Sequence, residues 1–283
     1  MSETVHFGFG AITTAGLFLA LGLAEMAWPA RRTTDQAGPR FLGNVVLYLL
    51  PEMLLLLPAA AAIAAATTAR GAAVGVLGWL YLPSWLHAAA ALLVLDAVTY
   101  ASHRLSHVVP ALWRLHAVHH SDPALDVSTT LRHHPVEAIY TTAFTVVAVV
   151  TMGISAAEVA GFIVLEWAVQ LAAHANIGVP RNLDTWLSRI LVTPGFHQRH
   201  HSRDVVETDT NFGQVFVFWD ILFGSLCRVP RSPACAVEFG LDDFRDARSQ
   251  WLDRLLAQPW LPRTGPADHT RPAAPRALTP PAL

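Results

Sequence analysis

The chain has 283 residues, of which 53% are hydrophobic and only 14% charged, with a formal net charge of −2. These proportions exclude a disordered chain, and the near-zero net charge argues against a nucleic-acid partner. An average soluble domain carries about 25% charged residues. Residues 1–175 hold 17 charged residues and residues 176–283 hold the other 23. The sequence therefore predicts a membrane protein whose polar part comes late in the chain.

Five apolar stretches are long enough to be considered as membrane helices. They cover residues 9–28, 42–68, 85–107, 136–152 and 155–174. Pro51 and Pro58 interrupt the second stretch, and Gly153 separates the last two, which are short and are expected to form a hairpin. The predicted fold class is all-α: an integral-membrane bundle of about four to five helices with a cytoplasmic helical cap.

The arginines set the expected orientation, because positively charged loops stay on the cytoplasmic side. Arg31, Arg32 and Arg40 follow the first stretch, whereas only Arg70 lies between the second and the third. The first loop is therefore predicted to be cytoplasmic. The histidine-rich segments, which follow the third stretch and the hairpin, then face the cytoplasm as well. We expect an integral protein of a bacterial inner membrane.

Four regions are expected along the chain. Residues 1–92 would form N-terminal membrane helices, residues 93–225 the histidine-rich region, and residues 226–258 a cytoplasmic amphipathic segment. Residues 259–283 hold seven prolines and are predicted to be disordered. Within the polar part, Leu183–Leu191 and residues 241–256 have apolar stripes that predict amphipathic helices at the membrane surface.

Histidine is the anomaly of the composition, since 11 of the 14 histidines lie within residues 103–201. Eight of them form one HxxxH motif and two HxxHH motifs, in which residues three and four apart share a helix face, and His174 ends the fifth apolar stretch. The candidate metal ligands are His103, His107, His116, His119, His120, His174, His197, His200 and His201. Neutral imidazole binds iron, copper, nickel and zinc, and nine rings are too many for one ion and suit two.

In order and spacing, residues 92–225 resemble the fatty acid hydroxylase/sterol desaturase superfamily of integral-membrane di-metal oxygenases. The resemblance rests on the motifs Asp96…Tyr100-Ala-Ser-His103, Trp113-Arg-Leu-His-Ala-Val-His-His-Ser121, Arg132-His-His-Pro-Val-Glu137, Thr193-Pro-Gly-Phe-His-Gln-Arg-His-His-Ser202, Asn211-Phe-Gly213 and Trp219-Asp-Ile-Leu-Phe-Gly224. It implies a histidine-held di-iron centre, in which zinc can replace iron in purified protein, and O2 as co-substrate. The nine histidines above match the ligand positions, and His134 is a tenth candidate.

The resemblance also implies an external electron donor, a ferredoxin- or cytochrome-type protein with an NAD(P)H reductase. Some members have a histidine where this chain has Gln170, which leaves the number of ligands at one metal open. The implied reaction is hydroxylation of an unactivated C–H bond of a membrane lipid, fatty acyl, sterol or related, at the cytoplasmic face. Desaturation and ether-lipid monooxygenation are alternatives on the same site, and the sequence gives no oligomeric state.

Two other functional classes stay open from the residues themselves. A membrane metal transporter or store would place ligands near mid-membrane on several spans. A bis-histidine haem electron carrier would need histidine pairs on facing spans at similar depth. The clustering of the motifs on one side of the membrane favours the oxygenase over both.

Four polar residues near the motifs are candidates for orienting the ligands. Asp96, two helical turns before His103, is interpreted as a partner of a ligand histidine or as a residue of a polar groove. Glu137 either hydrogen-bonds a ligand or begins a helix. Asn211 and Asp220 are candidates for the same supporting role or for turns and caps.

Overall fold

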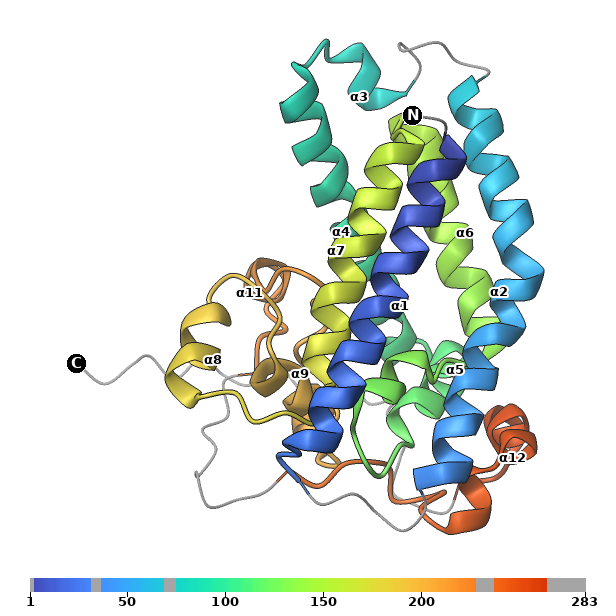
Figure 1. Ribbon diagram of the computed structural model, residues 1–283, viewed down its shortest axis with the longest axis vertical. Coiled ribbons are helices and arrows are strands. Elements are labelled where there is room, and N and C mark those ends of the chain that lie inside the picture. The colour runs from blue at the N-terminus through green and yellow to red at the C-terminus, as the bar shows by residue number, and fades with distance from the viewer. Residues whose placement is uncertain (1–2, 32–36, 69–74, 228–236, 264–283) are drawn as a thin grey trace.

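The computed structural model describes residues 3–31, 37–68, 75–227 and 237–263, with the backbone alone for residues 3–11, 37 and 54–68. Every regular element in these ranges is a helix, and β-structure is limited there to three isolated bridges. The predicted all-α class is therefore confirmed. Figure 1 shows an upright bundle of long helices, with α3 at its upper end and most of the other short helices toward its lower end.

The long helices correspond to the five apolar stretches. They are α1 (Glu3–Ala27), α2 (Ala37–Thr68), α4 (Ser84–Val108), α6 (Pro135–Met152) and α7 (Ala156–His174). By length and composition α4, α6 and α7 can cross a membrane, and α1 contains a shorter apolar helix. Helix α2 continues through Pro51 and Pro58. Each proline removes one backbone hydrogen bond, which a membrane bundle tolerates because neighbouring helices can satisfy the freed backbone group.

The predicted hairpin at Gly153 is confirmed. Gly153 ends α6 with a φ of 76°, a left-handed conformation that glycine adopts without strain. Two residues later Ser155 begins α7, where its hydroxyl and the side chain of Glu158 form a reciprocal capping box. Gly75 packs against this turn so closely that a Cβ atom there would clash with the backbone of Gly153.

The main apolar core lies where α4 meets the α6–α7 hairpin. Its buried members are Leu77, Ala91, Leu95, Val149, Ile154, Ala156, Val159, Phe162 and Val215. Val215 belongs to the polar part of the chain, so that part is anchored on the membrane helices. Around this core α1 packs on α7 and α2 packs on α6.

The remaining helices are short, and most of them lie at the lower end of the bundle (Figure 1). They are α3 (Val76–Trp79), α5 (Pro110–His120), the 3-10 turn η2 (Val127–Leu131), α8 (Arg181–Leu187), α9 (Pro194–His200), α10 (Val205–Thr208), α11 (Phe218–Leu222), η3 (Ala247–Gln250), α12 (Leu252–Ala257) and η4 (Gln258–Trp260). The described start of the predicted disordered tail therefore carries a 3-10 turn, and residues 264–283 lie outside the described residues.

Two predicted amphipathic helices need correction. The helix expected over Leu183–Leu191 ends at Leu187, because the carbonyl of Ile190 and the amide of Val192 pair instead with the chain near residue 216. The single helix expected over residues 241–256 was wrong. Phe244 has a φ of 63°, which breaks a right-handed helix, and the segment forms η3 and α12 in its place.

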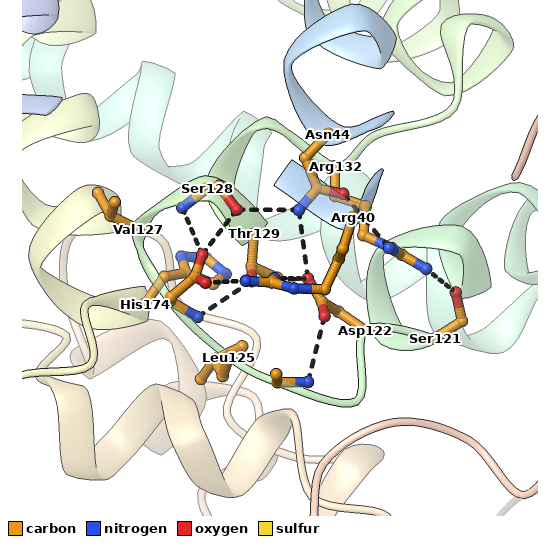
Figure 2. A network of polar contacts seen from close by, with 12 residues as sticks. Arg40, Asn44, Ser121, Asp122, Leu125, Val127, Ser128, Thr129, Arg132 and His174 are labelled. Carbon is orange, nitrogen blue, oxygen red and sulfur yellow. Dashed lines mark hydrogen bonds and ion pairs between the residues drawn. The ribbon is translucent and has the colours of Figure 1, made fainter. Parts of the chain in front are cut away.

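A buried network of charges ties α2 to the loop that follows α5 (Figure 2). Arg40 pairs with Asp122, with 2.8 Å between Nη1 and Oδ2, and also with Asp126. The Thr129 hydroxyl donates to Asp122 over 2.9 Å. Burial alone would raise the pKa of Asp122, but Arg40 and Arg132 hold it below its usual range, so this carboxylate is charged.

Arg132 extends this network to the end of α5 and is fully buried. Its Nε donates to the Val118 carbonyl and its Nη2 to the Ser121 hydroxyl, both over 2.8 Å. A third contact, 3.3 Å to the Asn44 amide oxygen, returns to α2. Val118 and Ser121 flank two clustered histidines, so Arg132 fixes the helix end that carries them.

We predict that Asp122→Asn destabilises the protein strongly. The substitution leaves two buried arginines short of a counter-charge, which typically costs about 3–5 kcal/mol. The thermal unfolding midpoint of the purified protein in detergent should fall clearly. Arg248→Gln is the matched control, because its ion pair with Asp253 is solvent-exposed, and it should leave the midpoint unchanged. An unchanged midpoint for Asp122→Asn would contradict the role given to the network.

Candidate metal centre

The fold brings the nine sequence-predicted histidines together at the lower end of the bundle, in two groups. The five-histidine site consists of His103, His107, His116, His120 and His200. The four-histidine site consists of His119, His174, His197 and His201. Within each group the nearest ring nitrogens lie within 4.8 Å of one another, and all nine residues are buried.

Each HxxHH motif divides its rings between the two sites. In α5, His116 and His120 enter the five-histidine site while His119 enters the other. In the second motif, at α9, the division is reversed: His197 and His201 enter the four-histidine site, and His200 alone enters the five-histidine site. Steps of three and four residues along a helix differ by about 100° in direction, since one turn takes 3.6 residues. One motif thus supplies both sites, and the two sites share their supporting helices.

In the four-histidine site the Nε2 atoms face one another at hydrogen-bonding distance. His174 Nε2 lies 3.0 Å from that of His197, 3.1 Å from that of His201 and 3.3 Å from that of His119. The Nε2 atoms of His197 and His201 are 3.2 Å apart. Imidazoles bound to one metal at about 2.0–2.1 Å have nitrogens roughly 3.0–3.4 Å apart. The spacing therefore fits a shared metal ion.

In the five-histidine site, acceptors hold the outer ring nitrogens. The Nδ1 atoms pair as follows: His103 with the Phe212 carbonyl (2.9 Å), His107 with Asp209 Oδ1 (3.2 Å), His116 with Glu137 Oε1 (2.6 Å) and His200 with the Thr210 carbonyl (2.8 Å). A proton on Nδ1 leaves the Nε2 lone pair for a metal. Nε2 of His200 is buried without a hydrogen-bond partner among the described residues, an orphan that a bound cation would satisfy.

Burial keeps these rings in the form that binds metal. It lowers the pKa of His200 to about 3, and it lowers the pKa values of His120 and His201 well below 6.5, with neighbouring rings adding to the effect. Neutral imidazole is the ligand form. A donor set made only of buried imidazoles fits two first-row transition ions such as iron or zinc.

Glu137 performs both roles that were considered for it from the sequence. It lies in the first turn of α6, and its Oε1 accepts from His116 Nδ1 over 2.6 Å. The same oxygen lies 3.1 Å from Nδ1 of His133. The ring of His133 stacks on His119, with centroids 4.3 Å apart. Sequence reasoning missed His133, although its position four residues before Glu137 was a usable signal.

His134, considered from the sequence as a tenth ligand, lies outside both groups. Its Nδ1 accepts from the amide of Val136 at the start of α6, and its Nε2 lies 3.2 Å from the Leu256 carbonyl. The backbone at His134 is extended, so neighbouring side chains point to opposite sides. His133 therefore faces the cluster and His134 faces α12.

Asp96 contacts no histidine through its hydrogen bonds. It is fully buried and accepts from three donors, the amides of Val215 (3.0 Å) and Phe216 (3.3 Å) and the indole of Trp219 (2.8 Å). The carboxyl group thus holds the segment that follows α10 against α4. Asp96 also does not lie in a polar groove, which was the alternative considered from the sequence, because it is fully buried.

Asp220 and Asn211 shape the same segment. Asp220 accepts from the amides of Phe212 and Gly213, both over 2.8 Å, and it thereby fixes the carbonyl that pairs with His103. Asn211 has a φ of 59°, donates to the Phe196 carbonyl over 3.0 Å and accepts from a backbone amide over 2.7 Å. Asn211 thus has the turn role, and Asp220 acts on a ligand ring through one backbone carbonyl.

Gln170 supports a ligand through its backbone. Its carbonyl lies 2.8 Å from His174 Nδ1, and its side-chain amide donates to the Gln214 carbonyl over 2.5 Å. The four-histidine site is complete in imidazoles without a side chain from position 170.

A cavity of about 410 Å³ begins at the histidines and runs upward between α2, α4, α6 and α7. At its lower end it is lined by His103, His116, His119, His174 and His197. The lining on α7 extends from Val159 to His174, a rise of roughly 22 Å along the helix. The shape is that of an elongated space reaching from the metal centre into the apolar part of the bundle.

Comparisons with known proteins place this geometry in a family. A family profile described as fatty acid hydroxylase matches residues 88–225. The ornithine lipid hydroxylase OlsE of Rhizobium tropici is 32% identical over 143 residues, half of this chain and 41% of that protein. The alkylglycerol monooxygenases of Danio rerio and Homo sapiens are 26% and 32% identical over 60% and 48% of this chain.

These relatives are longer than the matched region, which covers 36% of the Danio rerio protein and 29% of the human one. No solved structure matches the chain significantly. The profile match contains all nine clustered histidines, Glu137 and Asp220. Residues 88–225 therefore carry the sequence signature of the fatty acid hydroxylase family.

Proposed function

We propose that the chain is an O2-dependent lipid monooxygenase that hydroxylates a C–H bond of a membrane lipid. The observation that carries this proposal is the cavity, which joins a double cluster of neutral imidazoles to the space between apolar helices. The family is one of iron-dependent oxygenases. Relatives named as a lipid hydroxylase and as monooxygenases favour oxygen insertion over desaturation, and ornithine lipids and alkylglycerol ethers are the first lipids to test.

Two iron ions would be held by the five-histidine and four-histidine sites, and when bound they supply the activation of O2 for C–H cleavage. The protein's own groups orient the ligand rings and enclose the lipid. Glu137 and the carbonyls of Phe212 and Thr210 keep the ligand rings in one tautomer. Apolar cavity walls such as Val159 and Phe162 position the part of a lipid chain that lies away from the histidines and exclude water from that part of the cavity.

Hydroxylation consumes a pair of electrons and a pair of protons with each O2, and the electrons are proposed to come from a separate ferredoxin- or cytochrome-type protein. The arginine pattern supports placing the metal centre on the cytoplasmic face of a bacterial inner membrane. A donor on that side would reach the lower end of the bundle without crossing the membrane.

The first prediction concerns metal and product together. Protein purified under iron-replete conditions should carry about two metal ions per chain, and cells expressing it should contain an oxygenated lipid that depends on O2. His119→Ala and His200→Ala should each lower the metal content and abolish the product, because each removes one ligand. Elemental analysis and lipid mass spectrometry measure the two outcomes.

His134→Ala is the matched control for this experiment, since His134 belongs to the same histidine-rich region but forms hydrogen bonds only with backbone groups. It should retain the metal and the product. Unchanged product in both ligand variants would contradict the proposed function. An absorption spectrum with a strong Soret band would instead favour the haem electron carrier.

A second prediction concerns Glu137→Gln. The amide cannot accept a charge-assisted hydrogen bond from His116, and loss of such a supporting group typically weakens metal binding about 10–100-fold. Competition with a chelator, followed by zinc release from the zinc-loaded protein, measures the change. Glu238→Gln, a substitution on the exposed surface, serves as the control and should bind zinc as the wild type does. Equal affinities for the two variants would refute the role of Glu137.

A further inference from the structure

Two acidic side chains line the cavity at the membrane level, away from the histidines. Glu52 lies on α2 and Glu166 on α7, and these helices contact each other. Neither carboxyl group forms an ion pair with a basic side chain among the described residues. Acidic groups inside a membrane bundle are costly, and they commonly serve a ligand.

Two aromatic rings stand beside these carboxyl groups. Tyr48 lies one helical turn before Glu52, Trp167 follows Glu166 directly, and both rings line the same cavity. Their centroids are 5.3 Å apart and their planes cross at 75°. Aromatic faces next to acidic groups form the environment that proteins use to bind ammonium ions.

A third observation points to a ligand independently of the acidic pair. Thr130 lines the cavity near the histidine end and is only 8% exposed. Its hydroxyl has no hydrogen-bond partner among the described residues. A buried hydroxyl without a partner costs stability unless a ligand or water satisfies it. The cavity therefore offers polar contacts at both ends of an otherwise largely apolar space.

We propose that the cavity selects a lipid bearing an amine, whose ammonium group binds in the part of the cavity that Glu52, Glu166, Tyr48 and Trp167 line. An ammonium group there can take an ionised carboxyl group as its counter-charge, whereas a hydrocarbon chain or a neutral alcohol gains no such charge pairing. Glu166 precedes His174 by eight residues, or roughly 12 Å along the helix. The amine therefore binds about two helical turns from the metal centre while another part of the lipid lies at the histidines.

This inference takes from the proposed function only that the ligand is a lipid, and binding alone can test it. The zinc-loaded full-length protein is titrated with hexadecylamine and with hexadecanol, which share one chain length and differ in charge. The wild type should bind the amine at least about tenfold more tightly. Glu52→Gln and Glu166→Gln should each reduce amine binding and leave alcohol binding unchanged.

Zinc content verifies that each variant retains its metal centre, and Glu238→Gln controls for a change of net charge and should keep the preference. Equal affinity of the wild type for the two amphiphiles would overturn the proposal without any variant, and so would a double Gln variant that keeps the amine preference. If the preference is present but no lipid is oxygenated in cells, the amine site stands and the oxygenase function fails. If lipids are oxygenated without any preference, only the amine site fails.

Discussion

Nine buried imidazole rings packed into one end of a helical bundle are the constraint on which the rest of this structure depends. Their inward nitrogens lie 3.0–3.3 Å apart in the four-histidine site. Lone pairs at that distance repel unless a proton or a cation lies between them, and a few protons cannot satisfy so many nitrogens. A metal ion between the nitrogens would remove that repulsion, so the surrounding protein has to hold the rings with their inward nitrogens ready to bind one.

The surrounding structure meets that requirement from the outer side of the rings. Backbone carbonyls and Glu137 accept from the outer nitrogens, while Asp220 and Asp96 hold the chain segment that supplies one of those carbonyls. Arg132 fixes the end of α5. The charged groups near the centre therefore act mostly on backbone and helix ends. This division explains why Asp96, Asp122 and Asp220 lie close to the cluster without bonding to its rings.

Local patterns predicted the fold well where short-range physics decides the outcome. Gly153 and the two flanking apolar stretches were sufficient for the hairpin, because a left-handed glycine ends a helix at that residue. Helical spacing also picked out eight of the nine histidines that converge, and the ninth, His174, was expected from its position at the end of the fifth apolar stretch. The stripe over residues 241–256 misled, because an apolar period does not reveal that Phe244 adopts a left-handed backbone conformation.

The assignments that depend on tertiary geometry were beyond the sequence. Which histidine of an HxxHH motif enters which site depends on the placement of partner helices, and the motif alone gives only the angles between its rings. His133 and His134 differ in role because an extended backbone turns one toward the cluster and the other away. Asp96 looked like a partner of a histidine two turns away, but the backbone amides that reach it come from residues 215 and 216.

The charge network of Figure 2 bears on how such a protein can evolve. Arg40 and Asn44 come from α2, which precedes the region that carries the family signature, yet they hold residues beside the metal centre. On α1, Glu25 likewise accepts from the amide of Val127 over 2.8 Å. The family region on its own would retain buried charges without their counterparts. The part of the chain that must be inherited together is accordingly longer than the region that matches the family. A recombination event that exchanges residues 88–225 would have to exchange α1 and α2 as well.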